Sequence, residues 1–298
     1  MDFDPNDGQS ITGIGTIGPY ILVFKQTKTY IVYDLDTGAN RALSSETGCF
    51  AHRSICETPN GTYFLTADRG VYLTDGQHLK QISEKINPTL ENIVAAQRVN
   101  AAGKYFNNHY YLSICTTGST NNLTLDYDSQ TDSWWFHTNT ANQFALWRPG
   151  SGLELYAIQA GAAILDKSYV EDVFQDNGAS YNSYWQGPWF SFKQPYLRKR
   201  VRRFHVEGDG PVDVYMSHDF TDAPQLLGQS AFPGPDGTTF GGSGTFGGAG
   251  TFGDPSGFGQ HRYYSLGVAR VWSPRFEANT SAEAEIESFT FNITPRKD

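Results

Sequence analysis

The sequence contains no apolar run approaching the ~18 residues that span a bilayer, and no charged N-terminal stretch followed by an apolar one. It therefore predicts a soluble protein without a membrane span or a classical secretion signal. Charged residues are scarce, at 18%, and the net charge is −9. This acidic balance argues against a dedicated nucleic-acid binder, whose surface should be basic, so DNA contact is the less favoured interpretation.

The common motifs of catalysis and metal binding are also absent. The chain has no GxSxG, HExxH, GxxxxGK[ST] or helix-opening GxGxxG pattern. Its three cysteines, Cys49, Cys56 and Cys115, show no CxxC or Cys/His metal spacing. They are expected to be buried thiols. We expect no enzyme activity, no cofactor and no metal.

What the chain does contain is a series of aromatic and β-branched segments that end in Asp-rich turns. Residues 29–38 read TYIVYDLDTG and residues 124–135 read TLDYDSQTDSWW, with weaker versions at 70–78 and 162–168. Aromatic residues make up 14% of the chain and glycine occurs 31 times, as suits short strands joined by tight turns. Repeated strand–turn units without intervening helices predict an all-β protein.

Four such units follow one another over about residues 11–178. We expect the turns that correspond to one another in the four units to contain Asp36, Asp75, Asp128 and Asp166. Propeller blades of four strands repeat at roughly 40–50 residues, and this spacing predicts a domain over residues 1–179 with about four propeller-like blades, an incomplete ring or a small one. A short helix is expected over residues 88–98, between the second and third units, with Pro88 in its first turn.

The character of the sequence changes near residue 180. Residues 282–293, AEAEIESFTFNI, alternate almost strictly between polar and apolar, which predicts a strand, and residues 180–298 are expected to form a small β-sandwich or jelly-roll-like domain. A Gly/Phe-rich insertion occupies residues 239–259. Its phenylalanines, spaced six apart, are Phe240, Phe246, Phe252 and Phe258. The insertion is either a flexible linker or an ordered segment whose rings dock on a neighbouring subunit.

The densest charge feature is a basic run near the start of this second domain. It contains Arg198, Lys199, Arg200, Arg202 and Arg203. The run is either a strand whose long basic stems cover a sheet face, or an assembly contact. Against the negative net charge, an acidic neighbouring subunit is favoured over nucleic-acid phosphate as its partner.

The Asp-rich turn after residue 125 allows two further interpretations. Asp126, Asp128, Gln130 and Asp132 have the alternating spacing of a calcium loop, but no Glu closes the loop at position twelve, so we expect these Asp to cap a hairpin turn. The segment YDSQTDSW also resembles the Asp-box of sialidases, which is structural in their propellers. A glycosidase, recognised by two carboxylates in a central pocket, is the second alternative function.

The tryptophans supply the first alternative function. An exposed cleft lined by Trp134, Trp135 or Trp147 with polar neighbours would indicate a carbohydrate- or receptor-binding module.

The segment from Gly13 to Ile86 carries a family resemblance. Its order, "FK…TYIV … GC…A…SI … NG.YFL….GVYL.DG … IS..I", resembles that of virion propeller proteins of tailed bacteriophages, including tail-nozzle and packaged-DNA stabilisation proteins. The resemblance implies a structural component of the virion tail or neck, made in the host cytoplasm, in a homo-oligomeric ring around the DNA channel or carrying fibres. Its implied partners are other tail or neck proteins.

In such proteins more chain usually precedes the matching segment. We therefore expect a second polypeptide or a neighbouring copy to complete the propeller by pairing with a blade edge near residues 1–20 or 160–180. The segment YILVFKQ, residues 20–26, carries little charge and is expected to be such an edge strand.

Overall fold

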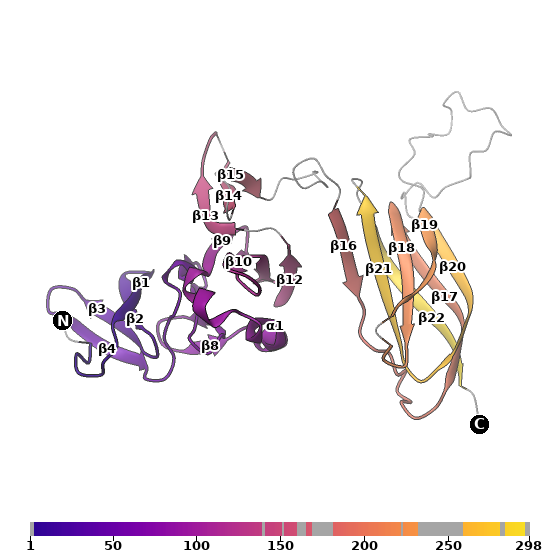
Figure 1. The fold of residues 1–298 in the computed structure, drawn as a ribbon, viewed down its shortest axis with the longest axis horizontal. Helices are drawn as coiled ribbons and strands as arrows, with labels where there is room; N and C mark the ends of the chain where they lie inside the picture. The colour runs from indigo at the N-terminus through magenta and orange to yellow at the C-terminus, as the bar shows by residue number, and fades with distance from the viewer. Residues whose placement is uncertain are drawn as a thin grey trace. The chain divides into compact units, whose positions relative to one another are not determined.

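The structure of the protein is a computed structural model (Figure 1). The structure describes residues 3–138, 141–150, 152–159, 165–168, 181–221, 223–231, 259–280 and 284–295. The chain divides into two compact units, Met1–Val170 and Glu171–Asp298. The expected boundary at residue 179 lies among residues 169–180, outside the described residues, so its exact position stays a prediction. The all-β prediction is confirmed: the described strands form antiparallel sheets, blade-like in the first unit and a sandwich in the second.

The described strands of the first unit form four meander sheets in which strands pair in chain order (Figure 1). The first sheet contains β1 (Ile11–Ile17), β2 (Tyr20–Lys25), β3 (Thr29–Asp34) and β4 (Ala39–Ser44). The second contains β5 (Cys56–Thr58), β6 (Gly61–Leu65), β7 (Val71–Thr74) and β8 (Leu79–Gln81). The third contains β9 (Ala102–Phe106), β10 (His109–Ile114), β11 (Leu123–Asp128) and β12 (Ser133–His137). The fourth contains β13 (Ala141–Trp147), β14 (Glu154–Gln159) and β15 (Leu165–Ser168).

Each of these sheets, or blades, buries apolar side chains against the next. Phe24 of the first blade meets Phe64 of the second, with ring centroids 4.8 Å apart. Tyr63, on the opposite face of β6 from Phe64, stacks on Tyr110 of the third blade at 4.9 Å. Because successive side chains of a strand point to opposite faces, a fully buried strand such as β6 contributes to two cores at once.

The expected turn residues are partly correct. Asp75 follows the third strand of its blade and Asp128 is the last residue of the third strand of the next blade. Each accepts a hydrogen bond from the backbone N–H two residues on. In the first blade this role belongs to Asp34, which accepts from the N–H of Asp36, so the choice of Asp36 was wrong. Asp166 was also misplaced, because it lies inside β15 and pairs with Ala157. A side chain caps a turn only from the position just before it.

The helix expected over 88–98 is shorter than predicted. A 3₁₀ turn (η2, Glu84–Ile86) leads into α1 (Asn87–Glu91), and a second 3₁₀ segment (η3, Ala95–Asn100) follows. Pro88 does occupy the first turn of α1, as expected. The helix ends early because the chain turns towards the third blade, where the N–H of Val94 donates to the carbonyl oxygen of Cys115 at 2.9 Å.

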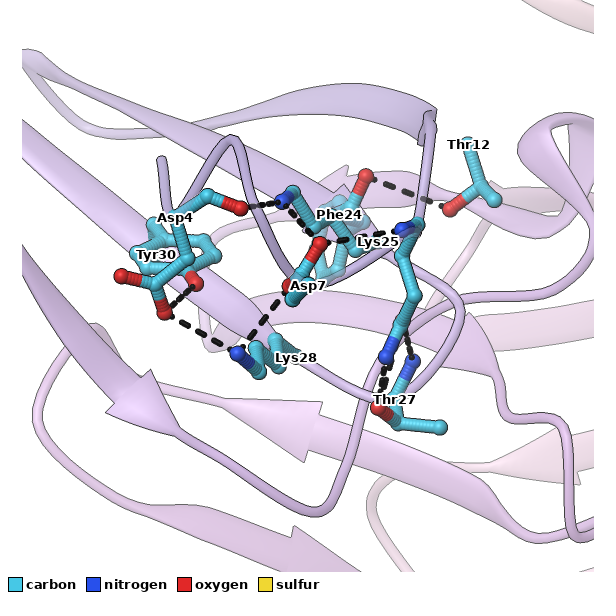
Figure 2. A network of polar contacts seen from close by, with 9 residues as sticks. Asp4, Asp7, Thr12, Phe24, Lys25, Thr27, Lys28 and Tyr30 are labelled. Carbon is cyan, nitrogen blue, oxygen red and sulfur yellow. Dashed lines mark hydrogen bonds and ion pairs between the residues drawn. The ribbon is translucent and has the colours of Figure 1, made fainter. Parts of the chain in front are cut away.

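The segment of residues 3–9, here called the N-terminal segment, packs on one face of the first blade (Figure 2). Phe3 packs edge-on against Tyr30, with ring centroids 5.4 Å apart. The Lys25 ammonium, buried at 3% exposure, lies 2.9 Å from an Asp7 carboxylate oxygen. Lys28 forms ion pairs with both Asp4 and Asp7, and the Tyr30 hydroxyl donates to Asp4. Val23, Tyr30 and Val32 are consequently buried within this chain.

The segment YILVFKQ was expected to be an edge strand, and this was wrong. It forms β2, which lies between β1 and β3. A fully apolar strand is better protected at the centre of a sheet than at its edge.

The second unit is a β-sandwich of two antiparallel sheets. The first sheet has the order β16 (Tyr181–Gln186), β21 (Trp272–Thr280), β18 (Pro211–His218) and β19 (Gln225–Ala231). The second has the order β20 (Gly259–Ala269), β17 (Lys199–Asp209) and β22 (Glu285–Pro295). Their inner faces meet in one aromatic core, where Phe204 lies 4.7 Å from Phe291 and 6.3 Å from Phe276 between ring centroids. The expectation of a sandwich is confirmed.

Candidate functional site

A pocket lies where the first strands of the four blades come together. β1 contacts β5 and its preceding 3₁₀ turn (η1, His52–Ser54), β5 contacts β9, and β9 contacts β13. The resulting hollow has a volume of about 230 Å³ and is lined by residues from all four blades, and we call it the first-strand pocket. Its lining includes Ile14, His52, Arg53, Lys104, Gln143 and Phe144.

Glycines permit the close approach of the strands around this pocket. A Cβ atom at Gly15 of β1 would lie 2.8 Å from the side chain of Ile55. One at Gly103 of β9 would lie 2.6 Å from the Tyr110 hydroxyl and 3.0 Å from the Ser54 carbonyl oxygen. A larger residue at either position would push neighbouring blades apart, so the glycines set the width of the pocket.

The turn that carries His52 and Arg53 is held by buried hydrogen bonds. The Ser54 hydroxyl donates to the Ala51 carbonyl oxygen at 2.7 Å and accepts from the N–H of Leu65 at 2.9 Å. The Tyr110 hydroxyl donates to the Ser54 carbonyl oxygen at 2.7 Å. Burial raises the pKa of Tyr110 well above its ordinary value, so the hydroxyl keeps its proton and remains a donor.

The ionisable groups that line the pocket are all basic. They are His52, Arg53 and Lys104, and no Asp or Glu is among the lining residues. Glu57 of β5 is not part of the lining and accepts a hydrogen bond from the Thr16 hydroxyl. Within the described part of the chain, neither Arg53 nor Lys104 forms an ion pair. The two carboxylates that the glycosidase alternative requires are therefore not found among the residues of this pocket.

The three candidate tryptophans occupy different environments. Trp134 packs between the second and third blades, where its ring lies 4.9 Å from that of Tyr127 and its Nε1–H donates to the Ile82 carbonyl oxygen at 3.1 Å. Trp135 is 51% exposed on the opposite face of β12, and Trp147, on the fourth blade, is 57% exposed. Trp134 thus has a core role, and the glycan-contact hypothesis rests on the other two.

The Asp residues that have the spacing of a calcium loop do not converge on one point. Asp126 is buried in β11 and bonds to two histidines, His109 Nδ1 at 2.7 Å and His137 Nε2 at 3.3 Å. Asp128 caps the turn, while Asp132 accepts from the Tyr127 hydroxyl and pairs with Lys85. Among the described residues, no group of three His, Cys, Asp or Glu side chains is placed to hold a metal ion. Asp128 caps the turn as expected.

The basic run divides between core and surface. Lys199 is fully buried and its ammonium donates to the Arg270 carbonyl oxygen at 2.8 Å, so it cannot meet a partner. Burial lowers the pKa of Lys199. The arginines at 198, 200, 202 and 203 are exposed. The Arg203 guanidinium lies 5.9 Å from the ring centre of Tyr264, which is itself 62% exposed.

The phenylalanines of the Gly/Phe-rich insertion, Phe240, Phe246, Phe252 and Phe258, lie outside the described residues, and their role stays a prediction.

The three cysteines are free and buried, as expected, and burial raises the pKa of Cys49 to about 12. No helix in the described part of the chain is long and apolar enough to cross a membrane.

Sequence reasoning missed the first-strand pocket. Its basic residues lie in different blades, and no short motif connects them. Arg53 lies in the turn η1 before β5, whereas Lys104 lies inside β9, so not even a shared repeat position marks the two residues in the sequence.

Comparison with known proteins leaves the family of this chain open. No protein-family model and no curated protein matches it. Among solved structures it is similar to a glycoside hydrolase family 43 arabinoxylan arabinofuranohydrolase from Bacillus subtilis in complex with cellotetraose. The identity is 9%, the TM-score is 0.28, and the match covers 99% of this chain and 66% of the other. The chain thus spans slightly less than two thirds of that enzyme's length.

This comparison contradicts the expectation that the chain is not an enzyme, because the similar structure is a glycoside hydrolase. We withdraw that expectation. At this TM-score the likeness supplies no argument for a particular activity of the chain either.

Proposed function

We propose that the protein is a structural component of a bacteriophage tail or neck, which assembles through the exposed faces of its sheets. The observation that supports this is the arginine-rich surface of β17. Arg200, Arg202 and Arg203 are exposed on this strand, and none of them has an ion-pair partner among the described residues. Arginine and tyrosine are enriched in protein interfaces, and the exposed Tyr264 lies beside Arg203.

The order of motifs from Gly13 to Ile86 adds support from the family resemblance. Its residues include Phe24, Tyr63 and Asp75, which form blade cores and cap a turn. A virion propeller lineage is therefore consistent with the way in which these blades are built.

Two experiments test the proposal. Antibodies against the purified chain should label the tail or neck of virus particles from the source, and particles without label would contradict it. In solution, native mass measurement should detect an oligomer that Arg200→Glu with Arg203→Glu weakens, because charge reversal repels an acidic partner surface. Lys193→Glu, an exposed charge reversal outside the strand, is the matched control.

A second candidate is a glycan- or receptor-binding module centred on Trp135. Its exposed ring lies opposite Asp126 in the strand register, beside the polar pair of His109 and His137. An aromatic face with adjacent polar groups suits sugar rings. Binding on a glycan array that Trp135→Ala abolishes, with Trp147→Ala as the comparison, would favour this candidate.

A further inference from the structure

We propose that the first-strand pocket binds a small anionic molecule, one that carries a carboxylate or phosphate group on an apolar body. The starting observation is electrostatic. Although the chain has a net charge of −9, every ionisable residue that lines this pocket is basic, and the lining comes from separate blades. Converging basic groups create a local positive potential that attracts anions.

The two cations are available to a ligand. Arg53 is exposed and Lys104 is half-buried, and neither forms an ion pair in the described part of the chain. The carboxylate on the same sheet face as Lys104 belongs to Asp126, two strands away, and it is already bonded to His109 and His137. A guanidinium and an ammonium on facing elements can bind a carboxylate or phosphate with charge-assisted hydrogen bonds.

The backbone that carries Arg53 and Lys104 is held in position before any ligand binds. Arg53 lies on the turn fixed by Ser54 and Tyr110. Lys104 follows Gly103, where a Cβ atom would lie only 3.0 Å from the Ser54 carbonyl oxygen of that turn. Binding therefore does not require the strands to be ordered first, and this reduces its entropic cost.

The other residues that line the pocket indicate the chemistry of the uncharged part of the ligand. Ile14, Ile55 and Phe144 provide apolar surface, and Gln143 adds a neutral donor and acceptor. A volume of about 230 Å³ admits a single small molecule and excludes a nucleic-acid duplex. The ligand class is thus a compact organic anion.

The test compares benzoate, phenyl phosphate and neutral benzamide, titrated into the full chain by calorimetry at physiological ionic strength, where nonspecific surface attraction is screened. We expect the two anions to bind with a Kd of about 1 mM or tighter and benzamide to show no binding. Stronger binding of phenyl phosphate would indicate a phosphate ligand, and stronger binding of benzoate a carboxylate ligand.

Substitutions locate the site. Arg53→Gln and Lys104→Gln should each weaken binding of the preferred anion by about tenfold, the loss expected for one charge-assisted hydrogen bond. Arg148→Gln and Lys80→Gln remove equivalent charges outside the pocket and should leave the Kd unchanged. An unchanged thermal midpoint in all four variants shows that they fold. Absence of anion binding, equal binding of benzamide, or equal weakening by the control variants would overturn the proposal.

Discussion

The hydroxyl of Tyr110, at the centre of the third blade, donates a hydrogen bond to the carbonyl oxygen of Ser54 at a distance of 2.7 Å. Both residues are fully buried, and this contact joins the third blade to the 3₁₀ turn that carries His52 and Arg53. The shape of the first-strand pocket therefore depends on a bond between residues 56 positions apart in the sequence.

Tyr110→Phe should destabilise the first unit by about 1–3 kcal/mol, because it leaves a buried carbonyl oxygen without its donor. The measurement is the free energy of unfolding in urea, followed by a probe in this unit. Tyr105→Phe removes a hydroxyl that bonds to the exposed Asn108 side chain, and it should change stability by less than about 0.5 kcal/mol. Equal effects of the two variants would contradict the structural role of the Tyr110 bond.

Gly103→Ala should destabilise the first unit by about 1–3 kcal/mol, because the added methyl would overlap the Tyr110 hydroxyl and the Ser54 carbonyl. Gly150→Ala is the control, since a Cβ atom there meets no heavy atom within 4 Å. Thermal unfolding of both variants, compared with the wild type, checks the difference. A Gly103→Ala protein as stable as the control would show that the blades can separate without cost.

Trp134→Ala should cost about 3 kcal/mol of stability, through lost packing on Tyr127 and the lost bond to Ile82. Trp135→Ala, one residue along the same strand, should change stability by less than about 0.5 kcal/mol because its side chain is half exposed. Urea unfolding followed by far-UV circular dichroism avoids relying on the fluorescence of the residues that are replaced. Comparable losses would mean that both rings are structural.

The N-terminal segment should detach from the first blade at acid pH. The hydrogen bond from Lys25 lowers the pKa of Asp7 below its usual range. Because the folded value lies below the unfolded value of about 3.9, the stabilisation is fully present above that pH and is lost as the pH falls through the lowered value. Limited proteolysis of residues 3–9 with an acid-active protease should therefore accelerate only below about pH 4.

At alkaline pH the stabilisation of the N-terminal segment depends on pH in the opposite direction, and it is lost as the pH rises. The hydrogen bond to Asp4 raises the pKa of Lys28, and burial raises that of Tyr30 to about 12. The stabilisation from Lys28 and Tyr30 is fully present below their unfolded pKa values, about 10.4 for Lys and 10 for Tyr. It is lost as the pH rises through the raised pKa values of the folded protein.

At pH 7, Asp7→Asn should release the N-terminal segment, because the buried Lys25 ammonium then loses its carboxylate partner. Faster proteolytic cleavage within residues 3–9 is the expected readout. Asp36→Asn is the control, since that exposed residue lies in a turn whose carboxylate cap is Asp34. Protection of the segment in the Asp7→Asn protein would show that Phe3 packing and the contacts of Asp4 with Lys28 and Tyr30 are enough to hold it.

The sequence by itself determined the local elements. Alternation, β-branched residues and Asp-rich turns located the four blade units and the last strand of the sandwich, because strand propensity and turn capping act over a few residues. The hairpin-capping roles of Asp75 and Asp128 and the burial of the cysteines followed from the same local chemistry.

Only the tertiary structure decided which face of each strand met another blade. Trp134 and Trp135 are adjacent and chemically identical, yet one lies in a core and the other on the surface. Lys199 and Arg200 divide in the same way within the basic run. Period-two alternation assigns neighbours to opposite faces but does not say which face is buried, because burial depends on the packing of distant segments. The first-strand pocket depends on such packing, since Arg53 and Lys104 become neighbours only when their blades stack.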